Sequence, residues 1–306
     1  MSEAALPAAA SRPRLSTDQV VMRAGLWLAV AFLAVFLVLP LGTLLMRAFE
    51  TPQGHFAGLA NFRDYATTPV LLAAAWNSLW TAALTAGIVV PLAFVYAYAL
   101  TRSCMPAKAA FRAVMMLPLL APSLLPALAL IYLFGNQGML RGVLLGHSIY
   151  GPIGIVIAQV FYCFPSAALI LAVALSTADA RLYEAASALK ASRARVFRTV
   201  TLPGARYGLV SAFVVVFTLV MTDFGIPKVI GGQFPVLATD VYKQVVGLQN
   251  FNMGAVVGIV LLAPAVLAYL LDRWATRQRA AKLSGRAVPL RPMPRRQRDL
   301  PLLVAC

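Results

Sequence analysis

The residue types that most often carry enzyme chemistry are sparse in this chain and stand far apart. Its three cysteines are Cys104, Cys163 and Cys306, without a CxxC spacing, and its two histidines are His55 and His147. Isolated residues of this kind argue against a zinc site or a disulfide framework. The chain contains no HExxH or GxSxG motif and no acid–base pair within an apolar segment. We therefore expect no catalytic residue, no metal site and no cofactor.

One acidic residue, Asp223, lies inside a long apolar stretch, in the run TDFGIP. A charge at membrane depth costs about 2.5–3.5 kcal/mol on insertion scales and usually faces a cavity or a partner. Gly225 and Pro227 indicate a break in the helix, which a membrane tolerates only where the backbone is buried in protein or lines an aqueous cavity. One interpretation is a gate or translocation-path element. The alternative is a helix end near the outer interface, with Asp223 solvated or paired with Lys228.

A polar, basic stretch, EAASALKASRARVFRTVTLP, interrupts the apolar chain from Glu184 to Pro203. Its pattern predicts a first helix over residues 177–189 and a second over 192–201, ended by Leu202-Pro203 because proline cannot continue the hydrogen-bond ladder. Ser176 followed by Asp179 resembles a capping box at the start of the first helix. The first helix would carry small and apolar residues on one face, namely Leu182, Ala185, Ala186 and Leu189.

This helical pair allows two interpretations. A compact knob with an apolar face and one acidic residue in a basic surround suits a groove in a partner protein. The same pattern is also typical of an amphipathic hairpin lying on a lipid surface.

The elements that position these residues are long apolar segments. The chain of 306 residues is 61% hydrophobic and 12% charged, whereas soluble domains carry about 25% charged residues. At about 20 residues per crossing, the sequence predicts an all-α membrane protein with six transmembrane helices. The predicted spans are 24–46, 70–100, 113–134, 152–175, 207–227 and 253–271. Residues 1–23 are expected to be a disordered N-terminus, 24–271 the six-span membrane domain with a core from about 70, and 272–306 a basic tail.

The distribution of positive charge predicts the orientation. Of the 26 Lys and Arg residues, 21 lie in the N-terminus, the 101–112 loop, the 176–206 loop and the tail, and five lie on the other side. This split predicts a cytoplasmic N-terminus by the positive-inside rule. It also explains the net charge of +16 through contact with anionic membrane lipids rather than nucleic acid.

The spacing within the polar stretch resembles a known motif. Glu184-Ala185-Ala186, with Val200, Leu202 and Pro203 downstream, resembles the EAA loop of ABC importer permeases, whose pattern is EAA, three residues, Gly, nine residues, Ile-x-Leu-Pro. The resemblance extends from Asn77-Ser78 to Leu271. It implies a type I ABC importer permease fold in which the 176–206 loop forms coupling helices that dock on an ATPase subunit, with the conserved Glu at Glu184.

One position departs from that pattern. The family usually has Gly where this chain has Lys190. Glycine there permits a left-handed turn between the two helices, and lysine in that conformation would cost about 1–2 kcal/mol. Either the turn is rebuilt with ordinary dihedrals or the strain is tolerated.

The resemblance also implies partners. No GxxxxGK[ST] phosphate loop occurs in the chain, so ATP hydrolysis is expected on separate ABC ATPase subunits. The other implied partners are a periplasmic or lipid-anchored substrate-binding protein and a second permease half, which could be identical, different or fused. The location implied is the bacterial inner membrane.

The substrate is a narrower question. The run from Asp223 through Gly231-Gly232 to Asp240-Val241-Tyr242-Lys243 resembles permeases assigned to 2-aminoethylphosphonate uptake, relatives of ferric-iron permeases. Lys228 and Lys243 could attract a phosphonate, or be ordinary loop lysines. The alternatives are a ferric-iron or other small-solute permease and, in a different class, an ion-coupled secondary transporter, which would normally show more intramembrane charge or inverted repeats. The apolar run at 300–306 could begin a further span, as in the first half of a fused two-part permease.

Overall fold

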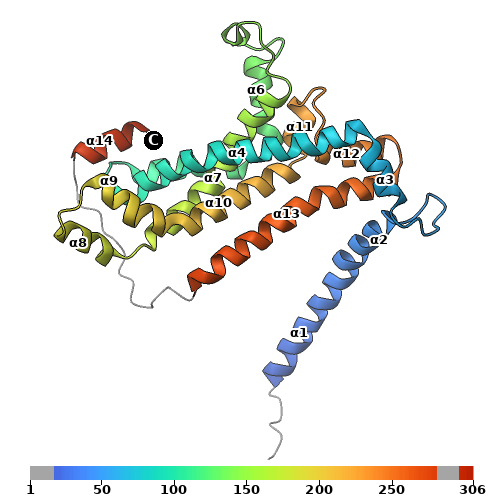
Figure 1. The fold of residues 1–306 in the computed structure, drawn as a ribbon, viewed down its shortest axis with the longest axis horizontal. Helices are drawn as coiled ribbons and strands as arrows, with labels where there is room; N and C mark the ends of the chain where they lie inside the picture. The colour runs from blue at the N-terminus through green and yellow to red at the C-terminus, as the bar shows by residue number, and fades with distance from the viewer. Residues whose placement is uncertain (1–16, 281–295, 306) are drawn as a thin grey trace, which may run out of the picture.

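A computed structural model describes residues 17–280 and 296–305, and every named element in these ranges is helical (Figure 1). Short 3-10 turns at 117–120 and 141–144 and π turns at 34–38, 197–201 and 243–247 join or extend the α-helices. The α-helices are α1 (Thr17–Leu33), α2 (Leu39–Arg47), α3 (Ala60–Thr67), α4 (Pro69–Arg102), α5 (Lys108–Met116), α6 (Leu124–Phe134), α7 (Pro152–Ser176), α8 (Ala180–Ala188), α9 (Arg193–Val196), α10 (Leu202–Thr222), α11 (Gly225–Ile230), α12 (Leu237–Tyr242), α13 (Phe251–Ala280) and α14 (Arg296–Ala305).

Within the described ranges, five helices are long and apolar enough to cross a membrane, and a sixth crossing is possible if one bent pair is counted. The five straight candidates cover Asp18–Arg47, Pro69–Arg102, Pro152–Ser176, Arg193–Thr222 and Phe251–Trp274. The all-α, multi-span fold is therefore confirmed, with a correction in the third predicted span.

The predicted span 113–134 is not a single helix. Lys108–Leu120 and Leu124–Phe134 meet at 97°, and Figure 1 shows α6 projecting sideways from the bundle. Ala121 between them is extended, with φ −101° and ψ 140°, as expected for the residue before a proline. The helix thus breaks at residues 121–123, where the extended Ala121 precedes Pro122.

The main core lies where α4, α7 and α10 pack together, with α13 against α10. Close approach depends on small residues, since a Cβ on Gly208 of α10 would lie 2.3 Å from the Cβ of Ala174 on α7. Small side chains let membrane helices gain dispersion contacts along their length. Helix α1 stands apart from this bundle in Figure 1, whereas α2 contacts α13, and none of the 18-residue apolar window of Asp18–Arg47 is buried.

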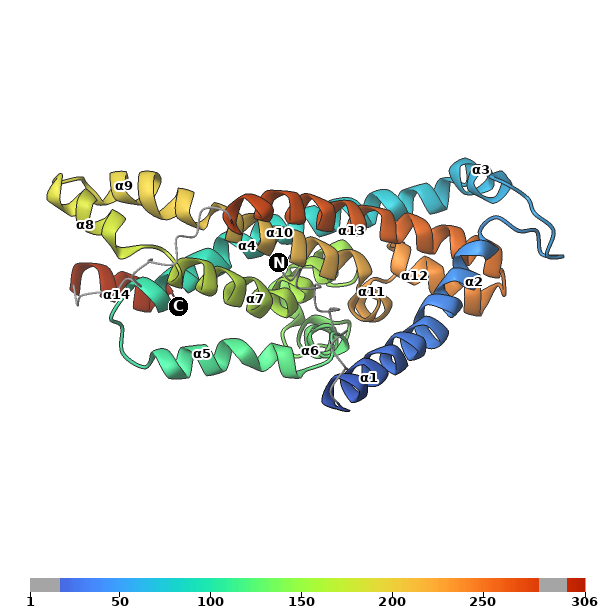
Figure 2. The same cartoon turned by 90° about the horizontal axis from the view of Figure 1, so that it is seen from below.

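A second, smaller core lies at the end of the bundle where α6, α11 and the start of α7 meet. Its buried residues are Ala127, Ile149, Ile155, Ala158, Ile226 and Ile230. Figure 2 shows α6 and α11 as neighbours near the middle of the view, with α12 and α3 beyond them and α8 and α9 on the other side. The two candidate sites therefore lie at opposite ends of α7 and α10.

Two π turns precede prolines in the membrane helices. Residues 34–38 are followed by Pro40, and residues 197–201 by Pro203. A π turn widens the ring of the helix and accommodates a proline that cannot donate to the ladder. The prediction that Leu202-Pro203 ends the second helix is therefore wrong, because α9, the turn and α10 form one continuous helix over Arg193–Thr222.

Two helices extend past the limits of the predicted segments. Residues 17–23, expected to be disordered, are the first turns of α1, and α13 continues past residue 271 to Ala280. The remaining predictions for residues 1–16 and 281–295 lie outside the described residues. The apolar end forms α14, where Leu302 and Leu303 pack against the main core beside α4.

Candidate functional site

The predicted first helix of the polar stretch is α8, and Asp179 caps it. The Asp179 Oδ1 accepts a hydrogen bond from the backbone N–H of Arg181 at 3.1 Å. Ser176, predicted as the cap, is instead the last residue of α7, and its hydroxyl donates to the Val173 carbonyl. A carboxylate is also the better cap, because it complements the positive end of the helix dipole.

One face of α8 is exposed and apolar. Leu182 is 58% exposed and Leu189, just after the helix, is 82% exposed. Glu184 and Ala185 are exposed beside them, while Ala186 is half-buried. An exposed apolar strip with one carboxylate, on a short helix away from the bundle, is the geometry expected of a docking element.

Lys190 adopts the left-handed conformation, with φ +51°. Its N–H donates to the Ser187 carbonyl at 3.0 Å, and the Ala191 N–H donates to the Ala186 carbonyl at 3.0 Å. This pair of bonds is the Schellman ending of a helix, with Lys190 at the position where glycine is preferred. The turn is thus the one that glycine would permit, and the lysine carries the strain.

A hydrogen bond between side chains brings the two halves of the polar stretch together. The Tyr183 hydroxyl of α8 donates to Thr201 Oγ1 at 3.1 Å, and Thr201 is buried in the 197–201 turn. Val200 in the same turn is half-buried, whereas Leu202 and Pro203 begin α10 and are exposed. The residues of the predicted motif therefore form one continuous structure, with Glu184 on its outer side.

The second candidate site is the helix break at Asp223. Helix α10 ends at Thr222, Asp223 is extended, and its Oδ2 accepts a hydrogen bond from the Ile226 N–H at 3.1 Å. The carboxylate also accepts hydrogen bonds from the side chains of Ser123 and Gln159. The predicted break is confirmed, and the half-buried Asp223 joins α10 and α11 to α6 and α7. It does not pair with Lys228.

Close packing surrounds this break. A Cβ on Gly225 would lie 2.4 Å from Ser123 Oγ, so a larger residue fits only if the Ser123 side chain moves. Pro227 is buried in α11. Gln159 is 1% exposed, and its Oε1 has no hydrogen-bond partner within the described residues, which leaves one buried acceptor free beside Asp223.

The two lysines considered as phosphonate contacts have partners in the chain. Lys243 Nζ lies 3.2 Å from Asp240 Oδ1, and Lys228 Nζ lies 4.5 Å from the centre of the Tyr242 ring. Burial raises the pKa of Asp240, and Lys243 partly opposes that shift. These contacts account for both lysines as local structural pairs.

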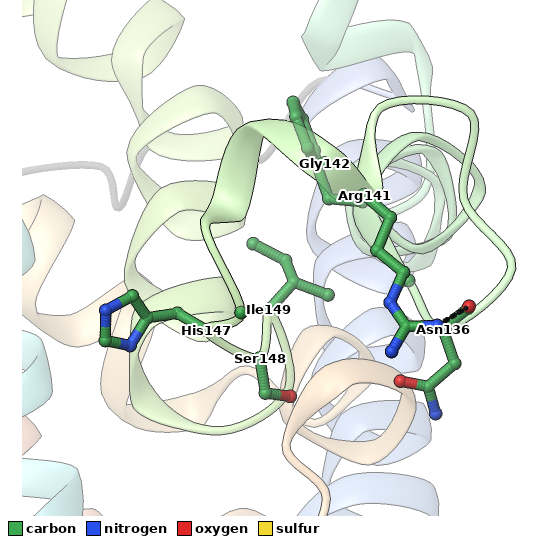
Figure 3. Close-up of a pocket in the computed structure, with 9 residues that line it drawn as sticks. Asn136, Arg141, Gly142, His147, Ser148 and Ile149 are labelled. Atoms are coloured by element: carbon green, nitrogen blue, oxygen red, sulfur yellow. Dashed lines mark hydrogen bonds between the residues drawn. The ribbon is translucent and has the colours of Figure 1, made fainter.

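A cavity of about 320 Å³ lies in the glycine-rich loop that follows α6. Arg141 Nη1 donates to the Asn136 carbonyl at 2.8 Å. Figure 3 shows Arg141 directed toward Asn136 while His147 points to the opposite side of the loop. The cavity thus belongs to one surface loop and does not gather polar groups on a common centre.

Comparison with known proteins identifies the fold and the family. The family model for the binding-protein-dependent transport system inner membrane component matches residues 89–280. The chain belongs to this family. The chain is 28% identical over 210 residues to the ferric transport system permease protein FbpB of Actinobacillus pleuropneumoniae, covering 65% of this chain and 31% of that protein. It is 34% identical over 213 residues to the thiamine transport system permease protein ThiP of Brucella abortus, covering 67% and 38%.

The chain therefore spans about a third of the length of these two relatives. A solved bacterial alginate ABC transporter, crystallised in complex with an alginate pentasaccharide-bound periplasmic protein, has a chain with a TM-score of 0.66 and 18% identity. That match covers 87% of this chain and 96% of the other chain. It shows the type I ABC importer permease fold, and the family is one of transport permeases.

Sequence reasoning missed several residues that hold these sites. From the sequence, Arg102 is no more than a positive charge in the 101–112 loop, yet in the structure it is buried and contacts Tyr183. In the sequence, Asn77 and Ser78 mark only the start of the resemblance. In the structure, Asn77 donates to the Pro235 carbonyl and Ser78 Oγ accepts from the Leu237 N–H. The only signal in the sequence is that each is polar at the edge of an apolar stretch.

Proposed function

We propose that this chain is the transmembrane permease subunit of an ATP-binding-cassette importer, and that α8 is the element on which a separate ATPase docks. The observation that carries the proposal is the exposed apolar face of α8 with Glu184 beside it. These residues occupy the positions of the EAA pattern, and the family match covers them.

A charge reversal tests the docking element. Glu184→Lys, in the permease co-expressed with its cognate ATPase, is expected to lose the ATPase on purification or to leave ATP hydrolysis without uptake, because losing one partner of an interfacial charge pair costs about 2–5 kcal/mol. Asp64→Lys makes the same charge change on an exposed residue of α3 and is expected to transport normally. Normal uptake by Glu184→Lys would refute the docking role.

The positive charge supports an orientation within this function. The N-terminus, the 101–112 loop, α8, α9 and the tail are placed on the cytoplasmic side, and α3 and α12 on the outer side. The further partners proposed are a periplasmic or lipid-anchored binding protein and a second permease half. Cysteines introduced at Ser187 on α8 and at the exposed Gln53 in the loop before α3 test the orientation, since an impermeant thiol reagent added to intact cells should label only the latter.

We further propose that the break at Asp223, Gly225 and Pro227 lies on the path of the solute. What supports it is the carboxylate at the break of a membrane helix, its bonds to Ser123 and Gln159, and the free Gln159 Oε1. Asp223→Asn is expected to keep the hydrogen bond from the Ile226 N–H and retain more transport than Asp223→Leu, which loses every side-chain acceptor. Equal transport by both variants and the wild type would remove Asp223 from the path.

For the solute we propose a small anionic or zwitterionic compound, with 2-aminoethylphosphonate as the first candidate. What supports it is the resemblance of the 223–243 run, and the internal pairing of Lys228 and Lys243 weakens a direct role for them. Iron or another small solute is the alternative, since the relatives carry ferric and thiamine names. Uptake of labelled phosphonate, ferric iron and thiamine by the assembled transporter separates these. Uptake that stops when the proton gradient collapses at constant ATP would instead indicate a secondary transporter.

A further inference from the structure

We propose that Arg102 is a positioning residue that fixes α8 to the ends of both α4 and α7, so that a displacement of α8 moves these helices together. The proposal rests on the proposed function only in taking a docked ATPase as the source of the displacement. The positioning itself is a property of the permease alone.

The side chain of Arg102 joins its own helix, α4, to two others, α7 and α8. Arg102 is the last residue of α4 and only 5% exposed. Its Nη2 donates to the carbonyl of Leu175, in the last turn of α7, at 2.7 Å. Its guanidinium carbon lies 4.7 Å from the centre of the Tyr183 ring on α8. A cation at a helix C-terminus and over an aromatic face makes two favourable contacts at once.

The same cluster reaches the start of α10. Tyr183 donates to Thr201 in the 197–201 turn. Phe197 in that turn meets the rings of Phe94 and Tyr98 on α4, edge to face, at 6.1 and 6.2 Å. These contacts therefore link α4 to α8, α8 to the 197–201 turn, and that turn back to α4.

Chain connectivity shows why α8 needs side-chain contacts to be linked to α4. Three residues (177–179) join α8 to α7, and four (189–192) join it to α9, but no chain segment joins α8 directly to α4. Movement of α8 could be absorbed in these short connections. Arg102 supplies the contact that carries the movement to α4, the longest helix of the bundle.

Stability alone is a weak explanation for an arginine at this position. Its Nε is buried without a hydrogen-bond partner within the described residues. Burying a cation with incomplete hydrogen bonding is costly, and apolar residues of similar volume often replace such groups without loss of stability. The geometry instead points to specificity, because a guanidinium can bond a carbonyl and stack on a ring in one fixed orientation.

A distance measurement on the isolated permease tests the positioning. Spin labels are placed at Ser187 on α8 and at the exposed Val95 on α4, after Cys104, Cys163 and Cys306 are replaced, and electron–electron resonance records the distance distribution. The parent protein is expected to give one narrow distance. Arg102→Met and Tyr183→Leu are expected to lose it, with unchanged helix content, whereas Tyr183→Phe keeps the ring and most of the order.

The matched control is Arg112→Met, which removes an exposed arginine on α5 and should leave the distance narrow. The proposal is overturned if Arg102→Met and Tyr183→Leu both keep the narrow distance, or if Arg112→Met broadens it equally. If Arg102→Met does not fold, the comparison of Tyr183→Leu with Tyr183→Phe decides.

A second measurement uses the complex with the cognate ATPase. Arg102→Met is expected to retain the ATPase on purification but to lower uptake per ATP hydrolysed, whereas a merely structural defect would lower both in step. A parent permease that binds no ATPase would defeat the proposed function and leave the distance result standing. Unchanged uptake per ATP in Arg102→Met would overturn the proposal that Arg102 makes α4 and α7 move with α8.

Discussion

The two ends of the bundle are held together in different ways. At the α8 end, a short polar helix is fastened by a few directional contacts, the Arg102–Leu175 and Tyr183–Thr201 hydrogen bonds and the Arg102–Tyr183 stack. At the α11 end, the break at Asp223 is enclosed by a small apolar core and by glycines in near contact with their neighbours. Directional contacts allow a helix to move as a unit, while close packing resists any change of shape.

The α11 end should therefore be the more sensitive to loss of volume. Ile230→Ala truncates a fully buried side chain of the second core and leaves a cavity. It is expected to lower the unfolding free energy by about 2–5 kcal/mol. Leu182→Ala on the exposed face of α8 should leave stability nearly unchanged. Thermal unfolding in detergent, followed by circular dichroism, measures both. Equal losses would show that α8 packs as tightly as α11.

The α11 end should also be the more sensitive to added side-chain volume. A Cβ on Gly154 would lie 2.0 Å from the Ile149 carbonyl oxygen and 2.7 Å from Ile230 Cδ1. Gly154→Ala is expected to destabilise the permease by about 1–3 kcal/mol, the usual range for overpacking. Gly87→Ala is the control, since nothing lies within 4 Å of a Cβ there. A neutral Gly154→Ala would mean that the second core is loose.

The α8 end contains strain that substitution can remove. Lys190→Gly is expected to raise the unfolding free energy by about 1 kcal/mol, because glycine accepts a positive φ without steric cost. Lys190→Ala keeps the Cβ and should gain little. The same denaturation assay compares them. A gain in both variants would assign the effect to the charge of Lys190 and not to its backbone.

The smallest expected effect is a pH dependence beside the α11 end. Burial raises the pKa of Asp240 in the folded protein, so the folded state holds this proton more tightly than the unfolded state. The resulting stability is present below the ordinary Asp range and is lost as pH rises through the raised pKa. The ordinary pKa of Asp is about 4. As the pH rises from about 4 to about 7, Asp240→Asn should therefore gain stability relative to the wild type. A difference that stays constant with pH would contradict this.

Much of the architecture could be predicted from the order of apolar and polar residues. The predicted spans at α4 and α7 agree with the observed ends within two residues, because a 20-residue apolar helix has few alternatives in a membrane. The break at Asp223 follows from Gly225 and Pro227. The prediction of one continuous third span is wrong because the helix breaks at residues 121–123, beside Pro122, and α6 takes a new direction.

The helical membrane architecture and the helix that carries Glu184 follow from the order of residues, and the motif resemblance adds the position where glycine is preferred. Local propensity, hydrophobic length and motif spacing are properties of neighbouring residues. The left-handed turn at Lys190 and the contacts of Arg102 with Leu175 and Tyr183 are visible only in the folded chain. Leu175 is 73 residues from Arg102 in the chain, and contacts at that separation depend on how whole helices pack, which no local pattern records.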